Sequence, residues 1–232
     1  DRDGKYQKLS PPLYTAVIDE AHKHGLKVTA HIFNLSDAKG LLRAGLDAFA
    51  HGIRDVDVDD EVLALFKARK HVVVVPNLPD RGVASDVNWL RGSVPAGDLT
   101  KLQDAATDRP QVQQAFALQA RNLDRLNKAG VTIGLGTDGN TPHAAHQELE
   151  DMVAAGMTPA QALVAATRNS AALLNMKDAG TLEPGKRADF VVLDANPLDA
   201  ITNTRRISAA YLSGVAINRT ALGARWSGTP AR

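Results

Sequence analysis

Residues 131–139 read VTIGLGTDG, and the interpretation of this run decides which α/β fold the chain adopts. Its glycines match the G-x-G-x-x-G spacing of a dinucleotide-binding turn, in which a helix starts directly after the last glycine. Here the segment NTP at 140–142 separates that glycine from any helix, and a second helix follows where a strand would be needed. The run therefore does not predict a dinucleotide site, and Asp138 becomes its residue of interest.

The sequence around this run alternates helices with short apolar strands. Helices are predicted at Leu13–His24, Ser36–Ala44, Asp59–Arg69 and Gln111–Ala129, and strands at Leu26–Phe33, Asp47–His51, His71–Pro76 and Val131–Gly136. Such alternation is typical of parallel β/α units. Four units are too few for a closed eight-stranded barrel but are enough for half of one.

The last third of the chain has a different pattern. Two helices, Ala144–Ala155 and Pro159–Leu174, precede two predicted strands, Ala188–Leu193 and Ile207–Leu212, and a short third at 215–217. We therefore divide the chain into residues 1–178, a half-barrel, and residues 179–232, a small β appendage. The run GTLEPGK at 180–186 resembles a P-loop, but Arg187 replaces the required hydroxyl and a strand follows, so a tight turn is predicted.

Residues 77–110 interrupt the β/α pattern. They are rich in proline, glycine and aspartate and are longer than an ordinary connection. Two interpretations remain open from the sequence: a lid over a site, and a disordered or decorative insertion.

Composition excludes several classes of function. Net charge is +1, and the 27 basic and 26 acidic residues are interspersed, which does not favour nucleic-acid binding. No apolar run approaches the roughly 18 residues that span a bilayer. There is no cysteine, which excludes thiolate chemistry and leaves the compartment unknown.

Three residues of types that bind metals stand at predicted strand ends. His31 ends the first strand, His51 ends the second, and Asp138 follows the fourth. Catalytic groups of β/α barrels lie at these carboxyl ends, and two imidazoles with a carboxylate suit zinc or a similar ion. Each residue alone also has a structural interpretation, a hydrogen-bonded histidine or a turn-forming aspartate. Their coincidence favours a metal site, in which Asp138 would also act as general base.

Three further residues are candidates for substrate contact. His143 and His146 follow Asp138 in the same loop, and Asn77 follows the third strand. The same carboxyl edge would bring them near the metal.

Several motifs together resemble the amidohydrolase superfamily, in its imidazolonepropionase-like and Xaa-Pro dipeptidase-like branch. They are VTAHIF (28–33), AFAHG (48–52), IGLGTDG (133–139), HQELEDMVAAGMTPAQALVAATRNSAALL (146–174) and GTLEPGKRADFVVLDANPL (180–198). The resemblance implies a (β/α)8 TIM barrel, with a divalent metal held by His-x-His on strand 1, Lys on strand 4, His on strands 5 and 6, and Asp on strand 8.

Matched by position, His31 corresponds to the ligand of strand 5, His51 to that of strand 6, and Asp138 to that of strand 8. The chain carries no His-x-His at a strand end, and it begins without Met. We therefore expect barrel strands 5–8 and part of a β-sandwich, with the other ligands on a preceding half. A complete enzyme would hold one or two ions, and zinc is the expected metal.

The resemblance implies a hydrolase that cleaves an amide or peptide-like C–N bond with a metal-activated water. Asp138 would be the general base, and His51 would help to polarise the carbonyl. A small-molecule or dipeptide-like substrate and a homo-oligomer are expected. A mononuclear deaminase is the alternative enzyme, although no Glu follows His31 or His51 closely. A non-catalytic scaffold is the alternative from another class.

Overall fold

The structure, a computed structural model, describes residues 7–139, 141 and 143–226, and its centre is a four-stranded parallel sheet. The strands are β1 (Thr29–His31), β2 (Ala48–Ala50), β3 (Val73–Val75) and β4 (Thr132–Ile133), in that spatial order. The prediction of parallel β/α units is confirmed. The strands are shorter than the apolar runs, because the residues after β2 and β3 leave the extended region.

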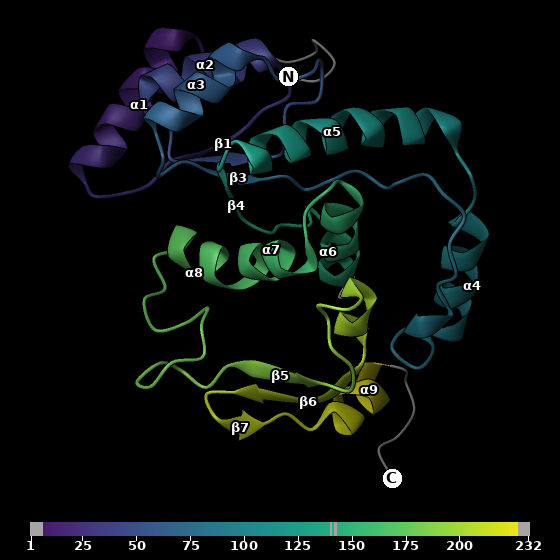
Figure 1. Cartoon of the computed structure of the whole chain (residues 1–232). Helices are drawn as coiled ribbons and strands as arrows, with labels where there is room; N and C mark the ends of the chain where they lie inside the picture. Colours follow the sequence, from purple (N-terminus) through teal and green to yellow (C-terminus); the bar gives the residue numbers. More distant parts are fainter. Residues whose placement is uncertain (1–6, 140, 142, 227–232) are drawn as a thin grey trace.

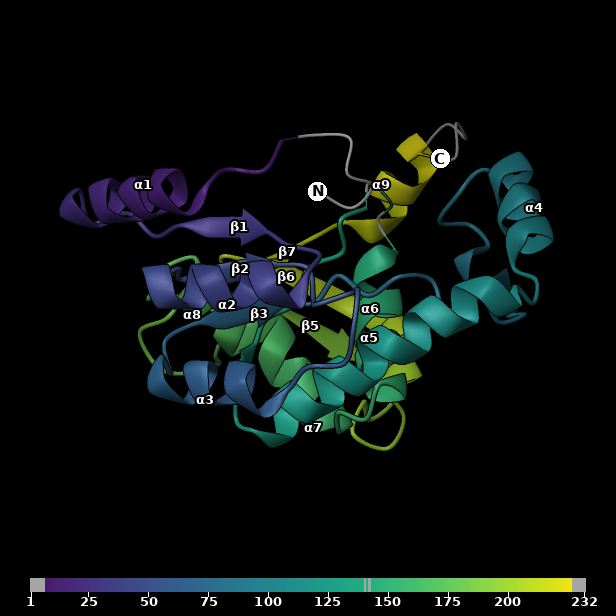
Figure 2. The ribbon, with the colours of Figure 1, turned by 90° about the horizontal axis from the view of Figure 1, so that it is seen from above.

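Helices α1 (Pro11–Lys23), α2 (Leu35–Ala44) and α3 (Asp60–Ala68) lie side by side (Figures 1 and 2). The long helix α5 (Pro110–Lys128) precedes β4 in the chain. All four were predicted within one or two residues. Phe49 of β2 is fully buried and packs edge-on against Phe66 of α3, with ring centroids 5.8 Å apart. The alternating apolar faces of sheet and helices therefore meet in one core. No helix in the described ranges is long and apolar enough to cross a membrane.

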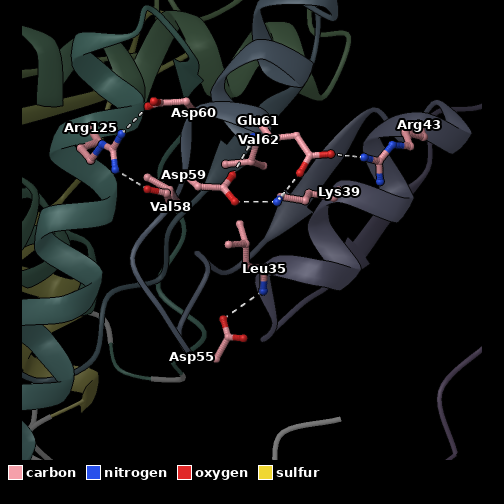
Figure 3. Close-up of polar contacts among 10 residues, drawn as sticks. All are labelled: Leu35, Lys39, Arg43, Asp55, Val58, Asp59, Asp60, Glu61, Val62 and Arg125. Carbon is pink, nitrogen blue, oxygen red and sulfur yellow. Dashed lines mark hydrogen bonds and ion pairs between the residues drawn. The ribbon is translucent and has the colours of Figure 1, made fainter.

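A polar network joins α2 to α3 beside the sheet (Figure 3). Lys39 Nζ lies 2.6 Å from an oxygen of Asp59 and 2.5 Å from one of Glu61. Asp59 also caps α3 by accepting a hydrogen bond from the N–H of Val62 at 2.9 Å. The network thus fixes the start of α3, which follows the loop from the end of β2.

Replacing Lys39 with Met should change how stability depends on pH. Hydrogen bonds from Lys39 hold the pKa values of Asp59 and Glu61 below their usual range. Because the folded pKa values are depressed, the stabilisation is present above the unfolded values, near pH 4, and is lost as pH falls through the folded ones. Urea unfolding at a series of acidic pH values should show a shallower decline for K39M. Parallel declines would contradict this role.

Residues 77–110 contain regular structure rather than only loop. The segment includes a short 3-10 helix, η1 (Asn88–Leu90), and helix α4 (Ala96–Ala105). Its two ends are joined by an ion pair between Asp80 and Arg109, 2.7 Å apart, and by the N–H of Arg109 on the carbonyl of Gly82. The described segment is therefore structured, and both roles, a lid and a decorative insertion, remain predictions.

The next helices are α6 (Ala144–Ala154) and a run made of α7 (Pro159–Val164), the π-helical turn η2 (Ala165–Asn169) and α8 (Ser170–Leu173). Thr158 forms the N-cap of α7, within a capping box completed by Gln161. The last residue of the π turn and the first residue of α8 contact the end of β4: Asn169 Nδ2 donates to the carbonyl of Ile133, and Ser170 Oγ accepts from the N–H of Leu135, just after the strand. These bonds fix the strand end that precedes Asp138.

A three-stranded antiparallel sheet completes the fold. It comprises β5 (Phe190–Leu193), β6 (Ile207–Leu212) and β7 (Val215–Ala216), with η3 (Ile201–Arg205) between β5 and β6 and helix α9 (Arg219–Trp226) at the end. Helices α6–α8 lie between the two sheets (Figure 1). The predicted turn at 183–186 is present, closed by Lys186 N–H on Glu183 O with Gly185 at φ +86°. The sequence did not predict α9.

Candidate active site

The carboxyl ends of β1, β2 and β4 bring His31, His51 and Asp138 together. Nδ1 of His31 lies 2.8 Å from Nε2 of His51, and the same Nε2 lies 3.8 Å from Oδ2 of Asp138. The parallel register explains this, because His31 is paired with Ala50 and so stands next to His51. Two imidazoles and a carboxylate from three strands therefore face one point of the rim.

The backbone is strained after β2, β3 and β4, at the carboxyl rim of the sheet. His51, Asn77 and Asp138 have φ values of +77°, +45° and +49°, and they are three of the five non-glycine residues with positive φ in the described part of the chain. Such conformations are maintained against a cost of about 1–3 kcal/mol each and cluster at functional sites. The left-handed turns aim successive side chains toward the same rim.

Gly136, the second glycine of the run GLGTDG (134–139), is required by close packing. A Cβ at this position would come within 2.5 Å of Val75 Cγ1 and would collide with the Asn77 side chain. The glycine therefore allows the β4 end to pass close to β3, as expected for a crowded rim. The turn away from the strand is made by Asp138 itself, which has a left-handed backbone conformation.

His51 is held neutral by its surroundings. Burial lowers its pKa, and the positive charge of Arg54 lowers it further, against a smaller opposing effect of Asp138. The residue is 5% exposed, whereas the side chain of Asp138 is 65% exposed. A neutral imidazole is the form that binds a metal ion, and an accessible carboxylate is suited to meeting water or substrate.

The Asn77 carboxamide lies against the second nitrogen of His51. Its Nδ2 is 3.4 Å from Nδ1 of His51, and its Oδ1 is buried without a hydrogen-bond partner among the described residues. A histidine that binds metal through one nitrogen usually donates its other N–H to a carbonyl oxygen. Exchange of the two amide atoms by rotation would supply that acceptor, so the environment of His51 fits a metal ligand.

The ligand set is nonetheless incomplete in this conformation. Within residues 7–139, 141 and 143–226, no three His, Cys, Asp or Glu side chains are arranged closely enough to enclose a metal ion. The donor types fit a divalent metal such as zinc, and the two imidazole nitrogens already meet. Oδ2 of Asp138 lies 3.8 Å from Nε2 of His51.

The structure places His143 and His146 beside a tryptophan of the 77–110 segment. The centroid of the Trp89 ring lies 6.1 Å from that of His143 and 5.9 Å from that of His146, both edge-on. Nδ1 of His146 is 3.1 Å from the hydroxyl of Thr204, which itself donates to the carbonyl of Ile201. That hydroxyl must therefore accept from the imidazole, which leaves Nε2 of neutral His146 as an acceptor. Burial lowers the pKa of both histidines.

Arg205, which belongs to η3 between β5 and β6, contacts both Trp89 and helix α6. Its guanidinium stacks on Trp89, 4.1 Å from the ring centroid, and forms an ion pair with Glu150 of α6. These residues line a pocket together with His143. The sequence did not single out Trp89, Thr204 or Arg205, because they come from two segments far apart in the chain and carry no local pattern.

The acidic run ELED at 148–151 was also missed. Charged residues on a helix are usually solvated, yet Glu148, Glu150 and Asp151 are 3%, 7% and 2% exposed. Burial raises the pKa of Glu148 to about 8 and that of Asp151 to about 7. Helical spacing gives no signal that both faces of α6 are covered.

Comparison with known proteins agrees with this geometry. The profile of the amidohydrolase family matches residues 6–217. The chain is 28% identical over 205 residues to ochratoxinase of Aspergillus niger, covering 87% of this chain and 39% of the relative. It is 38% identical over 103 residues to imidazolonepropionase of Deinococcus deserti, covering 42% of this chain and 26% of the relative.

The fold is also that of solved relatives. The crystal structure of a putative prolidase from Bifidobacterium longum superposes with a TM-score of 0.70 at 30% identity, covering 94% of this chain and 53% of that one. The chain thus spans about half of this structure and less than half of its curated relatives. With a matching profile over most of its length, a parallel α/β sheet and His, His and Asp at three strand ends, the chain belongs to the amidohydrolase family.

Proposed function

We propose that the protein is a metal-dependent hydrolase of an amide or peptide-like C–N bond, with its reaction centre at His31, His51 and Asp138. The observation that carries the proposal is the meeting of two imidazole nitrogens at 2.8 Å with a carboxylate 3.8 Å away, on the carboxyl rim of a parallel sheet. Membership of the amidohydrolase family supports it.

His31, His51 and Asp138 would hold the ion, most simply zinc, with further ligands required beyond these three. A bound divalent metal supplies Lewis acidity, which acidifies a water molecule and polarises a carbonyl. Asp138 would take the proton from the attacking water and deliver it to the leaving nitrogen. His51, neutral and held by its neighbours, keeps a nitrogen lone pair directed at the site and assists in polarising the carbonyl.

Asn77, His143 and His146 are proposed to contact the substrate. The pocket that His143 lines, between α6, the 77–110 segment and Arg205, has room for an organic side group, and its charges are balanced by ion pairs. A relative named ochratoxinase and a structure titled putative prolidase indicate small amides or dipeptides as the first substrates to try. In this scheme residues 77–110 close over the site as a lid.

The proposal extends to the domain organisation of the chain and to its assembly. The four parallel strands correspond to strands 5–8 of a (β/α)8 barrel, and β5–β7 to part of the β-sandwich, which divides the chain near residue 178. Apolar side chains stand exposed along α1 and before β1, at Leu13, Val17 and Leu26, as a covered surface in a larger assembly would require. A homo-oligomer is proposed on the same ground.

Hydrolysis assays test the proposal. The purified protein, with and without added zinc, should release product from N-acyl amino acids, Xaa-Pro dipeptides or an aromatic amide, and chelation should remove the activity. Deamination of cyclic amidines under the same conditions would favour the deaminase instead. Absence of both activities and of bound metal would favour a non-catalytic scaffold.

A further inference from the structure

Glu148 is a buried carboxyl group whose hydrogen-bond partners lie outside its own helix. It stands in the second turn of α6 and is 3% exposed. Its oxygens lie 3.2 and 3.1 Å from the backbone nitrogen of Leu78, and the N–H of Asn77 also donates to it. Burying an acidic group is expensive unless hydrogen bonds compensate it. The compensating donors here are the backbone of the turn after β3.

That turn carries the side chain that touches His51. Asn77 has φ +45°, and its carboxamide is wedged between Nδ1 of His51 and the glycine at 136. From the opposite side, the N–H of His51 donates to the carbonyl of Val75 at 2.8 Å, and the N–H of Gly52 donates to that of Pro76. The turn at 76–78 is thus held by β2 on one side and by Glu148 on the other.

We propose that Glu148 is a positioning residue of the active site. It accepts hydrogen bonds from the backbone N–H groups of Asn77 and Leu78 and so fixes the Asn77 carboxamide, which in turn orients the His51 imidazole. Without these acceptors the turn would lose its hydrogen bonds to α6, and the Asn77 carboxamide would no longer be fixed. The ring of His51 would then lose the contact at Nδ1 that sets its orientation and tautomer. The inference rests on the proposed function for its consequence, and on the contacts above for its geometry.

The test uses Glu148→Met, which removes both acceptor oxygens at similar side-chain length, with Glu150→Met as the matched control. Glu150 is the other buried glutamate of α6, and its ion pair is with Arg205 rather than with the turn. Histidine ring spectra of the metal-free protein, recorded by ¹H–¹⁵N NMR, should show a changed tautomer ratio or broadened signals for His51 in E148M and unchanged signals in E150M. Unchanged His51 signals in folded E148M would overturn the proposal.

Zinc titration supplies a second readout. E148M should bind zinc about 10-fold more weakly than the unchanged protein, since outer partners of a ligating histidine typically contribute 10- to 100-fold. In an Asn77→Ala background, the same E148M change should have little further effect, because both act through one contact. Fully additive losses would contradict positioning through Asn77. If E148M does not fold, Glu148→Asp, whose side chain is one methylene shorter, should show the same spectral change.

Failure here is separable from failure of the proposed function. If the unchanged protein binds no zinc, the metal proposal fails, and the spectra of metal-free E148M still decide whether Glu148 positions His51. If zinc binds and hydrolysis is found but the spectra do not change, the positioning proposal alone fails.

Discussion

Replacing Asp138 with Asn should reduce the hydrolysis rate by about 10²- to 10⁴-fold, which is what a positioned general base contributes. Asparagine keeps the size of the side chain and tolerates the left-handed backbone at φ +49°. It can accept no proton from water. The fold should therefore remain, while kcat falls much more than KM rises. Steady-state kinetics on the best substrate, with the metal content of both proteins measured, gives the answer.

Asp57 provides the control for that substitution. It lies in another loop at the same rim, is exposed, and forms an ion pair with Arg121 at 3.0 Å. Asp57→Asn removes the same charge from the same region and should leave the rate nearly unchanged. A D138N protein with full metal content and undiminished hydrolysis would eliminate Asp138 as the base.

Replacing His51 with Gln should weaken zinc binding more than 100-fold, beyond the 10- to 100-fold loss usual for an outer partner. The residue contributes one of the two nitrogens that meet at 2.8 Å, and its neighbours keep it neutral. Glutamine fills similar space but offers a weaker oxygen donor for zinc. Calorimetric titration with zinc, at constant pH, measures the loss directly.

His71 is the matched control, because it precedes β3 at the amino-terminal end of the same sheet and is exposed. His71→Gln should leave zinc affinity unchanged. Equal losses in both variants would show non-specific binding by surface histidines. Unchanged affinity in H51Q would remove His51 from the ligand set.

The parallel sheet was predictable from the sequence because local residue patterns mark where its helices begin and end. Glycine marks the end of α2, where Gly45 has φ +98°, and proline with an N-cap marks the starts of α1 and α7. The approach of His31 to His51 was predictable too, since the carboxyl ends of adjacent parallel strands meet at one edge.

The remaining features depend on contacts between distant segments. Arg205 contacts Trp89 and Glu150, which are both more than 50 residues away in the sequence. No local sequence pattern near any of the three predicts these contacts. The left-handed conformation of His51 could not be read from its residue type, which rarely adopts it. The π turn at 165–169 is likewise set by its bonds to β4 rather than by propensity.

X-ray absorption at the zinc edge, on protein loaded with one equivalent of zinc, tests the central claim most directly. The account predicts a first shell containing two imidazole nitrogens at about 2.0–2.1 Å together with oxygen ligands. It also predicts that the shell loses one imidazole in the H51Q protein. A shell of oxygen ligands only, or one that His51→Gln leaves unchanged, would contradict a metal site built on His31, His51 and Asp138.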